Sequence, residues 1–381
     1  MKWTSTKLGD FAPFVYGKGL PKAKRISGNV PVYGSNGIVG MHSESFVSQP
    51  AVIIGRKGSV GEVHLANGPS WPIDTAFFVL GSKEVDLHFL YYLLKTLPIT
   101  SNSDSAVPGL NRDFAHSLEI RVPDIHGQIA IGEVLSSLDK KIAANNALSK
   151  TLEEIAQTIF KSWFIDFDPV KAKMAGAKPA GMDAATAALF PDSMEESDLG
   201  LIPKGWKVRS IGDSVIKQKV GKLFDSKTSF PDGAVPVLDQ GKSGVVGFHD
   251  EEAGVFASPD MPLVVFANHT CSLRLISYPF SVIQNVFPLI GDKVDVIWLY
   301  FAVEGKQQFD SYKGHWPDFV LHKIIHPTEQ ATNAFRLTVE SLLKQKWLLE
   351  QQSKMLASLR DSLLPRLISG ELQIPDELLA S

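Results

Sequence analysis

The chain contains two long stretches in which apolar residues recur every three or four positions. No proline interrupts residues 128–164, where Asn145 and Ser149 occupy two positions of the repeat, and an apolar residue returns at every seventh position from Phe335 to Leu363. This spacing is that of a heptad repeat, whose apolar stripe faces a partner helix. We therefore predict two long helices that pair through Leu135, Leu138, Ile142, Leu152, Ile159, Leu342, Leu349, Leu356 and Leu363. The alternative is that each helix packs only on its own domain, although the stripes are longer than one small domain can cover.

Outside these stretches, the pattern indicates short strands and short helices. The continuous apolar runs Ala51–Ile54 and Leu263–Phe266 lie between turn-forming residues and predict buried strands. Residues 88–97 and 296–303 predict short helices. Each half of the chain is thus expected to hold one compact mixed domain that is followed by a long helix.

Short motifs of the first half return in the same order in the second half. The matched pairs are Trp3 and Trp206, Leu8–Asp10 and Ile211–Asp213, Val30–Val32 and Val235–Val237, Gly37–Gly40 and Gly244–Gly247, and Asp113–Phe114 and Asp318–Phe319. Collinear matches of this kind indicate an internal duplication. We predict five segments: a first domain over 1–125, a helix over 126–165, a connection rich in Ala, Gly and Lys over 166–204, a second domain over 205–325 and a second helix over 326–381.

Composition restricts the class of protein. The chain has 381 residues, of which 44% are hydrophobic and 21% charged, so it can bury more than one core. Its single cysteine, Cys271, excludes an internal disulfide framework and fits a reducing cytoplasm. The N-terminus lacks the apolar core of a signal peptide, and the apolar runs are too short to span a membrane. The net charge of −3 means that any DNA-binding surface has to be local or completed by a partner.

Several enzyme motifs are incomplete. Gly241-Lys242-Ser243 resembles the end of a phosphate-binding loop, but Pro236 stands where that loop needs a glycine. Pro231-Asp232 and the following residues resemble a metal-dependent nuclease, but Gln240 stands where a carboxylate is required. The histidines are scattered without metal-ligand spacing. We therefore predict no catalytic residues, no metal and no cofactor in this chain, and the missing carboxylate argues against a self-contained nuclease.

Loop residues of the first half suit nucleic acid. A basic loop without acidic residues would contact phosphates, and Asn and Arg side chains in later turns can form paired hydrogen bonds with base edges. The glycine after Arg56-Lys57 would let the backbone approach a duplex closely. The candidate DNA-binding residues are Lys18, Lys22, Lys24, Arg25, Ser35, Asn36, Arg56, Lys57, Ser59, Asn111 and Arg112.

Polar and basic residues recur at the matching places of the second half. These candidates are Lys217, Lys219, Lys222, Gln240, Lys242, Ser243, Asn268, His269, Thr270, Lys313, His315 and Trp316. Taken singly, each could belong to an ordinary solvated loop. Their recurrence at equivalent places in both halves favours a shared binding function.

Three segments resemble one known family. Trp163–Lys173, Leu201–Trp206 and Leu359–Glu371 are similar to the central segment, the entry to the second domain and the C-terminal end of type I restriction–modification specificity subunits. The resemblance covers the whole chain. It implies an α+β fold with two pseudo-symmetric target recognition domains, separated by two long antiparallel helices that form a coiled coil.

The same resemblance implies the partners. These are double-stranded DNA with a two-part asymmetric site, two methyltransferase subunits and restriction subunits that translocate DNA. S-adenosylmethionine, ATP and Mg would then belong to the partner subunits, and this chain would be non-catalytic. The alternative is the recognition subunit of a related type IIB-like or phage-exclusion methyltransferase system.

Overall fold

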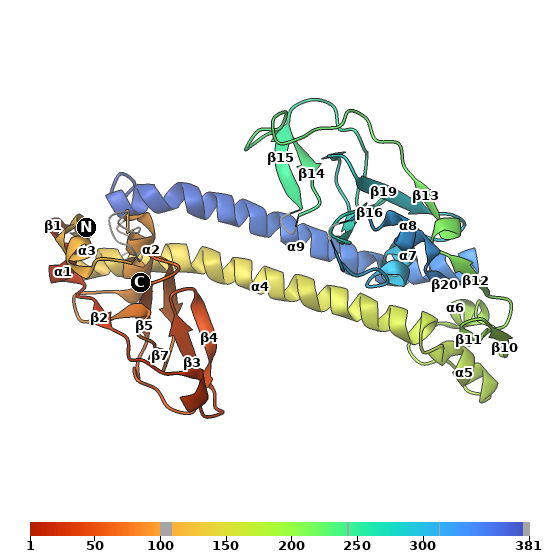
Figure 1. The fold of residues 1–381 in the computed structure, drawn as a ribbon, viewed down its shortest axis with the longest axis horizontal. Helices are drawn as coiled ribbons and strands as arrows, with labels where there is room; N and C mark the ends of the chain where they lie inside the picture. The colour runs from red at the N-terminus through yellow and green to blue at the C-terminus, as the bar shows by residue number, and fades with distance from the viewer. Residues whose placement is uncertain (100–108, 242–243, 312, 376–381) are drawn as a thin grey trace. The chain divides into compact units, whose positions relative to one another are not determined.

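The computed structural model of the chain describes residues 1–99, 109–241, 244–311 and 313–375. The chain forms two compact units, the first from Met1–Asn145 with Gln352–Ser381 and the second from Asn146–Gln351. Each unit contains one globular part together with half of helix α4 (Ile125–Phe164) and half of helix α9 (Glu329–Ser369), as the colours of Figure 1 allow the reader to follow. Both helices were expected from the heptad pattern. The units cut across the five predicted segments, because each half-helix packs on the globular part of its own unit.

The first unit is built around a four-stranded antiparallel sheet. Its spatial order is β2 (Val15–Tyr16), β8 (Ala76–Leu80), β5 (Ala51–Gly55) and β6 (Val63–Ala66). Strand β5 is buried along its whole length, as predicted. Successive side chains of a strand point to opposite faces. Accordingly, Val52 and Ile54 belong to one core, and Ala51 and Ile53 belong to another.

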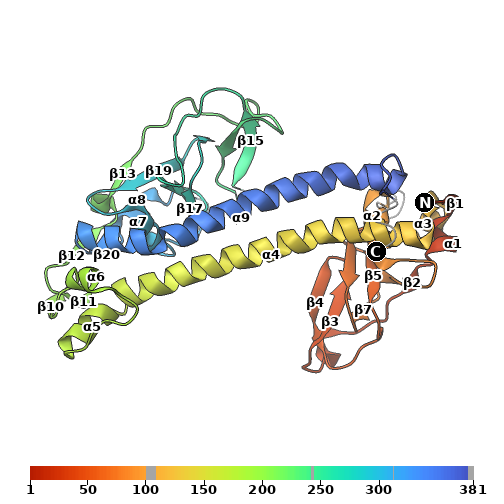
Figure 2. The ribbon, with the colours of Figure 1, turned by 180° about the vertical axis from the view of Figure 1, so that it is seen from behind.

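Different elements cover the two faces of this sheet. On one face lie α2 (Leu87–Thr96) and the nearby ends of α4 and α9, which contribute Leu135 and Leu367 to the same core. On the other lies a three-stranded sheet of β4 (Gly37–His42), β3 (Val30–Gly34) and β7 (Trp71–Pro72), visible beside β5 in Figure 2. The remaining elements are β1 (Trp3–Lys7) paired with β9 (Glu119–Pro123), α1 (Leu8–Phe11), η1 (Lys22–Lys24) and α3 (Arg112–Ser117).

The second unit repeats this topology strand for strand. Its four-stranded sheet has the order β13 (Val215–Lys217), β19 (Val286–Gly291), β16 (Leu263–Ala267) and β17 (Leu273–Ile276), and its three-stranded sheet is β15 (Val245–His249), β14 (Val235–Leu238) and β18 (Ser281–Val282). The other counterparts are β12 (Lys207–Ser210) with β20 (Lys323–His326), η2 (Gly212–Ser214), α7 (Val296–Val303) and α8 (Trp316–Leu321). The repeat seen in the sequence is therefore a duplication of the fold.

One pair of matched motifs was placed out of register. Helix α3 buries Ala115, whose N–H donates to Asn111, and helix α8 buries Phe319, whose N–H donates to His315. The two buried residues are therefore equivalent, and Phe114, which is 38% exposed, is not the counterpart of Phe319. The matching of Asp113–Phe114 with Asp318–Phe319 was wrong by one residue, because a chance identity of two residues outweighed the burial pattern.

The long helices run antiparallel within the first unit. Asp139 of α4 accepts hydrogen bonds from Arg360 of α9 and from Tyr92 of α2, both at 2.5 Å. Further along α4, Asn145 donates to Gln352 of α9 at 2.8 Å. From one contact to the next, the residue number increases on α4 and decreases on α9, as it does between antiparallel helices. The hydrogen bond with Asp139 raises the pKa of Arg360.

A similar link joins the helices in the second unit. Glu153 of α4 lies 3.2 Å from the ammonium of Lys346 on α9 and accepts a hydrogen bond of 3.3 Å from Tyr300 of α7. In this unit α9 also packs on the globular part, and its buried positions are Phe335, Val339, Leu343 and Trp347. These residues are four positions apart, which is the spacing of a helix face that packs against several neighbours. The seven-residue pattern instead predicted Leu342 as the residue on the pairing face.

The predicted pairing residues differ in burial. Leu135 is fully buried and Leu349 is 7% exposed. The half-buried residues are Leu138, Ile142, Leu152, Ile159, Leu342, Leu356 and Leu363.

Neither α4 nor α9 contains an apolar stretch that could cross a membrane, despite their length. The same holds for every other helix of the described ranges.

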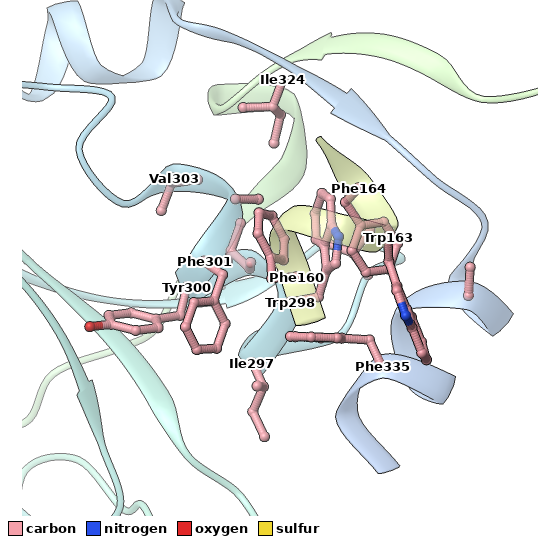
Figure 3. Close-up of a cluster of buried hydrophobic side chains, with 14 of the residues drawn as sticks. Phe160, Trp163, Phe164, Ile297, Trp298, Tyr300, Phe301, Val303, Ile324 and Phe335 are labelled. Carbon is pink, nitrogen blue, oxygen red and sulfur yellow. The ribbon is translucent and has the colours of Figure 1, made fainter. Parts of the chain in front are cut away.

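An aromatic cluster forms the centre of the second unit. Phe160 and Phe164 of α4 meet Trp298 and Phe301 of α7 and Phe335 of α9, as Figure 3 shows. Phe335 is fully buried and lies within 6.1 Å of four aromatic rings. The aromatic motif that begins at Trp163 is therefore part of a core.

The connection between the repeats is folded. It contains α5 (Asp168–Met174), α6 (Ala184–Ala188) and a hairpin of β10 (Met194–Ser197) and β11 (Gly200–Pro203). Phe190, from the segment that its composition suggested as a simple connection, is 1% exposed and packs against Trp163 and Trp206. Phe167, Val170 and Ile202 of this segment are buried in the same cluster, so several apolar residues attach the connection to the core.

Candidate nucleic-acid interface

Three loops of the first unit meet beyond the end of β5. They are the β3–β4 turn with Ser35 and Asn36, the loop of residues 56–61, and the residues that precede α3. Lys57 forms a β-bridge with Gly109, and the Leu110 N–H donates to the Arg56 carbonyl at 2.8 Å. The carbonyl of Ser35 lies 2.7 Å from where a Cβ on Gly55 would stand, so only glycine allows this approach. The structure therefore brings together the predicted residues Ser35, Asn36, Arg56, Lys57, Ser59, Asn111 and Arg112.

Two arginines from these loops share one aromatic ring. The guanidinium carbons of Arg56 and Arg112 lie 4.8 and 5.2 Å from the centre of the Tyr16 ring. Arg56 also donates to the Asp74 carbonyl at 3.1 Å. Stacking on a ring restrains the plane of a guanidinium group. Tyr16 was not predicted, although an exposed aromatic residue on an edge strand is a signal that could have indicated it.

The basic loop before β3 contains both free and engaged side chains. Lys22 and Lys24 are exposed, and the ammonium of Lys18 lies 5.7 Å from the rings of Phe46 and Trp71. Arg25 is half-buried and donates to the Val39 carbonyl at 2.7 Å. The guanidinium group of Arg25 therefore holds the loop against β4, and its contact with phosphate stays a prediction.

Equivalent loops of the second unit also converge. The His269 N–H donates to the Gln240 side chain at 2.7 Å, and the His269 ring lies 3.1 Å from the Lys313 carbonyl. The Trp316 N–H donates to the Asn268 side chain at 2.7 Å. These loops connect the strands that are equivalent to those of the first unit, as the sequence repeat predicted. Lys242 and Ser243 lie outside the described residues.

Two predicted contact residues of the second unit are internal. Asn268 is 8% exposed, and His315 is fully buried with its ring 3.0 Å from the Ser311 carbonyl. Tight loops leave main-chain groups without partners, and buried polar side chains satisfy them. The prediction that Asn268 and His315 contact DNA was therefore wrong. Thr270 and Lys219 remain exposed.

The lysines of the second unit are mostly engaged. The ammonium of Lys217 lies 3.9 Å from the Phe287 ring and 3.8 Å from the Trp316 ring, and its partial burial lowers the pKa of Lys217. Lys222 pairs with Glu251 at 2.5 Å. Lys313 lies between two carboxylates at 3.0 and 3.3 Å. Positive charge is thus less available on these loops than on those of the first unit.

The described residues include no group of three or more His, Cys, Asp and Glu side chains that could hold a metal ion. The side chains that converge on both units are instead cations, amides, hydroxyls and aromatic rings. Such an arrangement suits hydrogen bonding and charge complementarity with a polyanion.

A solved structure shares this fold. The S subunit of a type I restriction–modification system from M. genitalium has a solved structure that superposes with a TM-score of 0.61 at 17% identity. The superposition covers 97% of this chain and 96% of that chain. At this level of identity the likeness shows a shared fold.

Sequence comparison finds relatives of the chain. Residues 1–154 match the model of the type I restriction modification DNA specificity domain. The HindI specificity subunit of Haemophilus influenzae is 24% identical over 342 residues, which cover 72% of this chain and 73% of that protein. The MjaIX specificity subunit of Methanocaldococcus jannaschii is 23% identical over 355 residues, covering 85% and 78%. The chain is thus related to the specificity subunits of type I restriction enzymes, and the resemblance noted from its motifs is confirmed.

Proposed function

We propose that this chain is the DNA-recognition subunit of a type I restriction–modification complex, in which each unit binds one half of a two-part site. The observation that supports this best is that three loops converge in each unit. They bring cationic and polar side chains together at equivalent places of the two units. Phosphate contacts would position the protein, and contacts to base edges would select the sequence. Because the two sets of loops carry different residues, the two half-sites should differ in sequence.

The proposal extends to the partners. The two relatives are specificity subunits of the type I restriction enzymes HindI and MjaIX. By analogy, this chain would assemble in the cytoplasm with two methyltransferase subunits and with restriction subunits. Those partners would bind S-adenosylmethionine, ATP and Mg and would perform the chemistry, while this chain selects the site.

Methylome sequencing tests the modular part of this proposal. Host cells with the gene should show methylation at a two-part motif that is absent from cells without it. Asn36→Ala, in an exposed turn of the first unit, should relax base preference by about 5- to 150-fold in one half of the motif. Thr270→Ala, in the exposed loop that follows β16 in the second unit, should relax the other half alone. A change in both halves from either substitution would contradict the assignment of one half-site to each unit.

Salt dependence tests the electrostatic part. Lys57 is exposed, and within the described ranges no carboxylate lies within ion-pair distance of it. Lys57→Ala in the assembled complex should therefore weaken binding similarly for all sequences and reduce the salt slope by about one. Lys222→Ala is the matched control, because Glu251 already neutralises that lysine. Equal effects of the two substitutions on the slope, measured by titration at several salt concentrations, would argue against a phosphate contact at Lys57.

A further inference from the structure

The pair of arginines on Tyr16 is an unusual arrangement of charge. The distances of 4.8 and 5.2 Å to one ring centre keep the two guanidinium carbons within about 10 Å, or about three base-pair steps of B-DNA. Among the described residues, the one ion pair of these two groups is that of Arg112 Nε with Asp113, whose oxygen lies 3.7 Å away and whose side chain is 88% exposed. Two like charges are thus held close together without a strong partner. An arrangement of this kind is completed by a ligand that accepts hydrogen bonds.

The geometry favours a base edge over a phosphate. A guanidinium group presents donors in a planar fork that matches the O6 and N7 acceptors of guanine. Stacking on Tyr16 restrains that plane, and the bond from Arg56 to the Asp74 carbonyl restrains it further. A phosphate can be approached from many directions, so a flexible lysine such as the neighbouring Lys57 is sufficient for it.

The second unit lacks this pair. Trp316 begins α8 as Arg112 begins α3, and Asn268 follows β16 as Arg56 follows β5. An indole and an amide therefore stand where the first unit has its two guanidinium groups, and the ammonium of Lys217 from β13 lies against the rings of Phe287 and Trp316. Of these two matched pairs of described positions, the first unit has arginine at both and the second unit at neither.

We propose that Arg56 and Arg112 select guanine at two positions of the half-site bound by the first unit, within about three base-pair steps of each other. Tyr16 acts as the positioning residue, because its ring holds both guanidinium groups. This inference rests on the proposed function, and it names which residues of that interface determine sequence and which base they require.

The test uses the full chain in its complex with the methyltransferase subunits, with a library of DNA sites. Arg56→Lys and Arg112→Lys keep the charge and lose the fork, so each should reduce guanine discrimination at one position by about 5- to 150-fold. Tyr16→Leu should reduce discrimination at both positions, and Tyr16→Phe, which keeps the ring, should preserve it. Lys57→Ala should lower affinity without changing preference at either position.

A second measurement changes the DNA and begins with the unaltered protein. Replacing each guanine of that half-site by 7-deazaguanine removes the N7 acceptor, so it should weaken binding of the unaltered protein at two positions. Each Arg→Lys variant should respond less than the unaltered protein to the replacement at the position that its arginine contacts. The inference is overturned if no guanine of the half-site responds, or if the variants lower affinity equally for all sequences. A complex without any two-part sequence preference would instead refute the proposed function itself.

Discussion

Phe335→Ala is expected to destabilise the second unit by about 3–5 kcal/mol, the usual cost of deleting a large aromatic side chain from a core. Phe335 is fully buried and lies against Phe160, Trp163, Phe164 and Phe301. The cluster comes from elements that are distant in sequence, so neighbouring side chains cannot collapse into the cavity without moving a helix. The loss should therefore be at the upper end of the range for core substitutions.

Tryptophan fluorescence during guanidinium chloride unfolding is a suitable measurement for this variant. Five of the seven tryptophans belong to the second unit, so the signal reports mainly on that unit. Leu337→Ala is the matched control, because Leu337 lies on the same helix and is 71% exposed. Its effect should stay within about 0.5 kcal/mol. Similar losses for the two variants would mean that the aromatic cluster is not the stabilising core of this unit.

Leu135→Asp is expected to destabilise the first unit by about 3–5 kcal/mol, because it places an unpaired carboxylate inside a core. Leu135 is fully buried where α4 packs with α2 and the end of α9. The carboxylate would either stay charged in an apolar site or take up a proton, and both states cost free energy. Half-buried Leu138 should tolerate the same change better, because water can reach its side chain.

Hydrogen exchange with mass spectrometry can localise this effect. Peptides from α2 and from the first half of α4 should lose protection in Leu135→Asp. Ser137→Asp adds the same charge two residues away on the exposed face of α4, and it should leave protection unchanged. If both variants lost protection to the same degree, the charge itself and not its burial would be responsible.

Local patterns predicted most of the fold. The heptad spacing located α4 and α9, and apolar runs located β5 and β16, because these signals depend on neighbours within one element. The repeated motifs correctly indicated two copies of one topology. The positions of the three loops followed from that repeat, so the sequence identified most of the residues that converge on the first unit, including Arg56 and Arg112.

Errors arose where several elements meet. Asn268 and His315 are polar loop residues, and sequence alone does not reveal whether such a side chain faces solvent or the main chain. The structure shows that both are buried and bond to main-chain N–H or carbonyl groups. On α9, the seven-residue spacing predicted Leu342 where Leu343 and Trp347 are buried, because that half of the helix packs on a globular part as well as on α4.

The sequence by itself determined the two long helices, the duplicated strand order and the places of the candidate loops, since each depends on periodicity or on repetition along the chain. Only the tertiary structure decided which loop side chains remain available and which aromatic ring orients them. Tyr16 lies far from Arg56 and Arg112 in sequence, and their contact exists because β2, the end of β5 and the start of α3 meet in space. Contacts of this kind depend on the packing of whole elements, and no local pattern of residues encodes them.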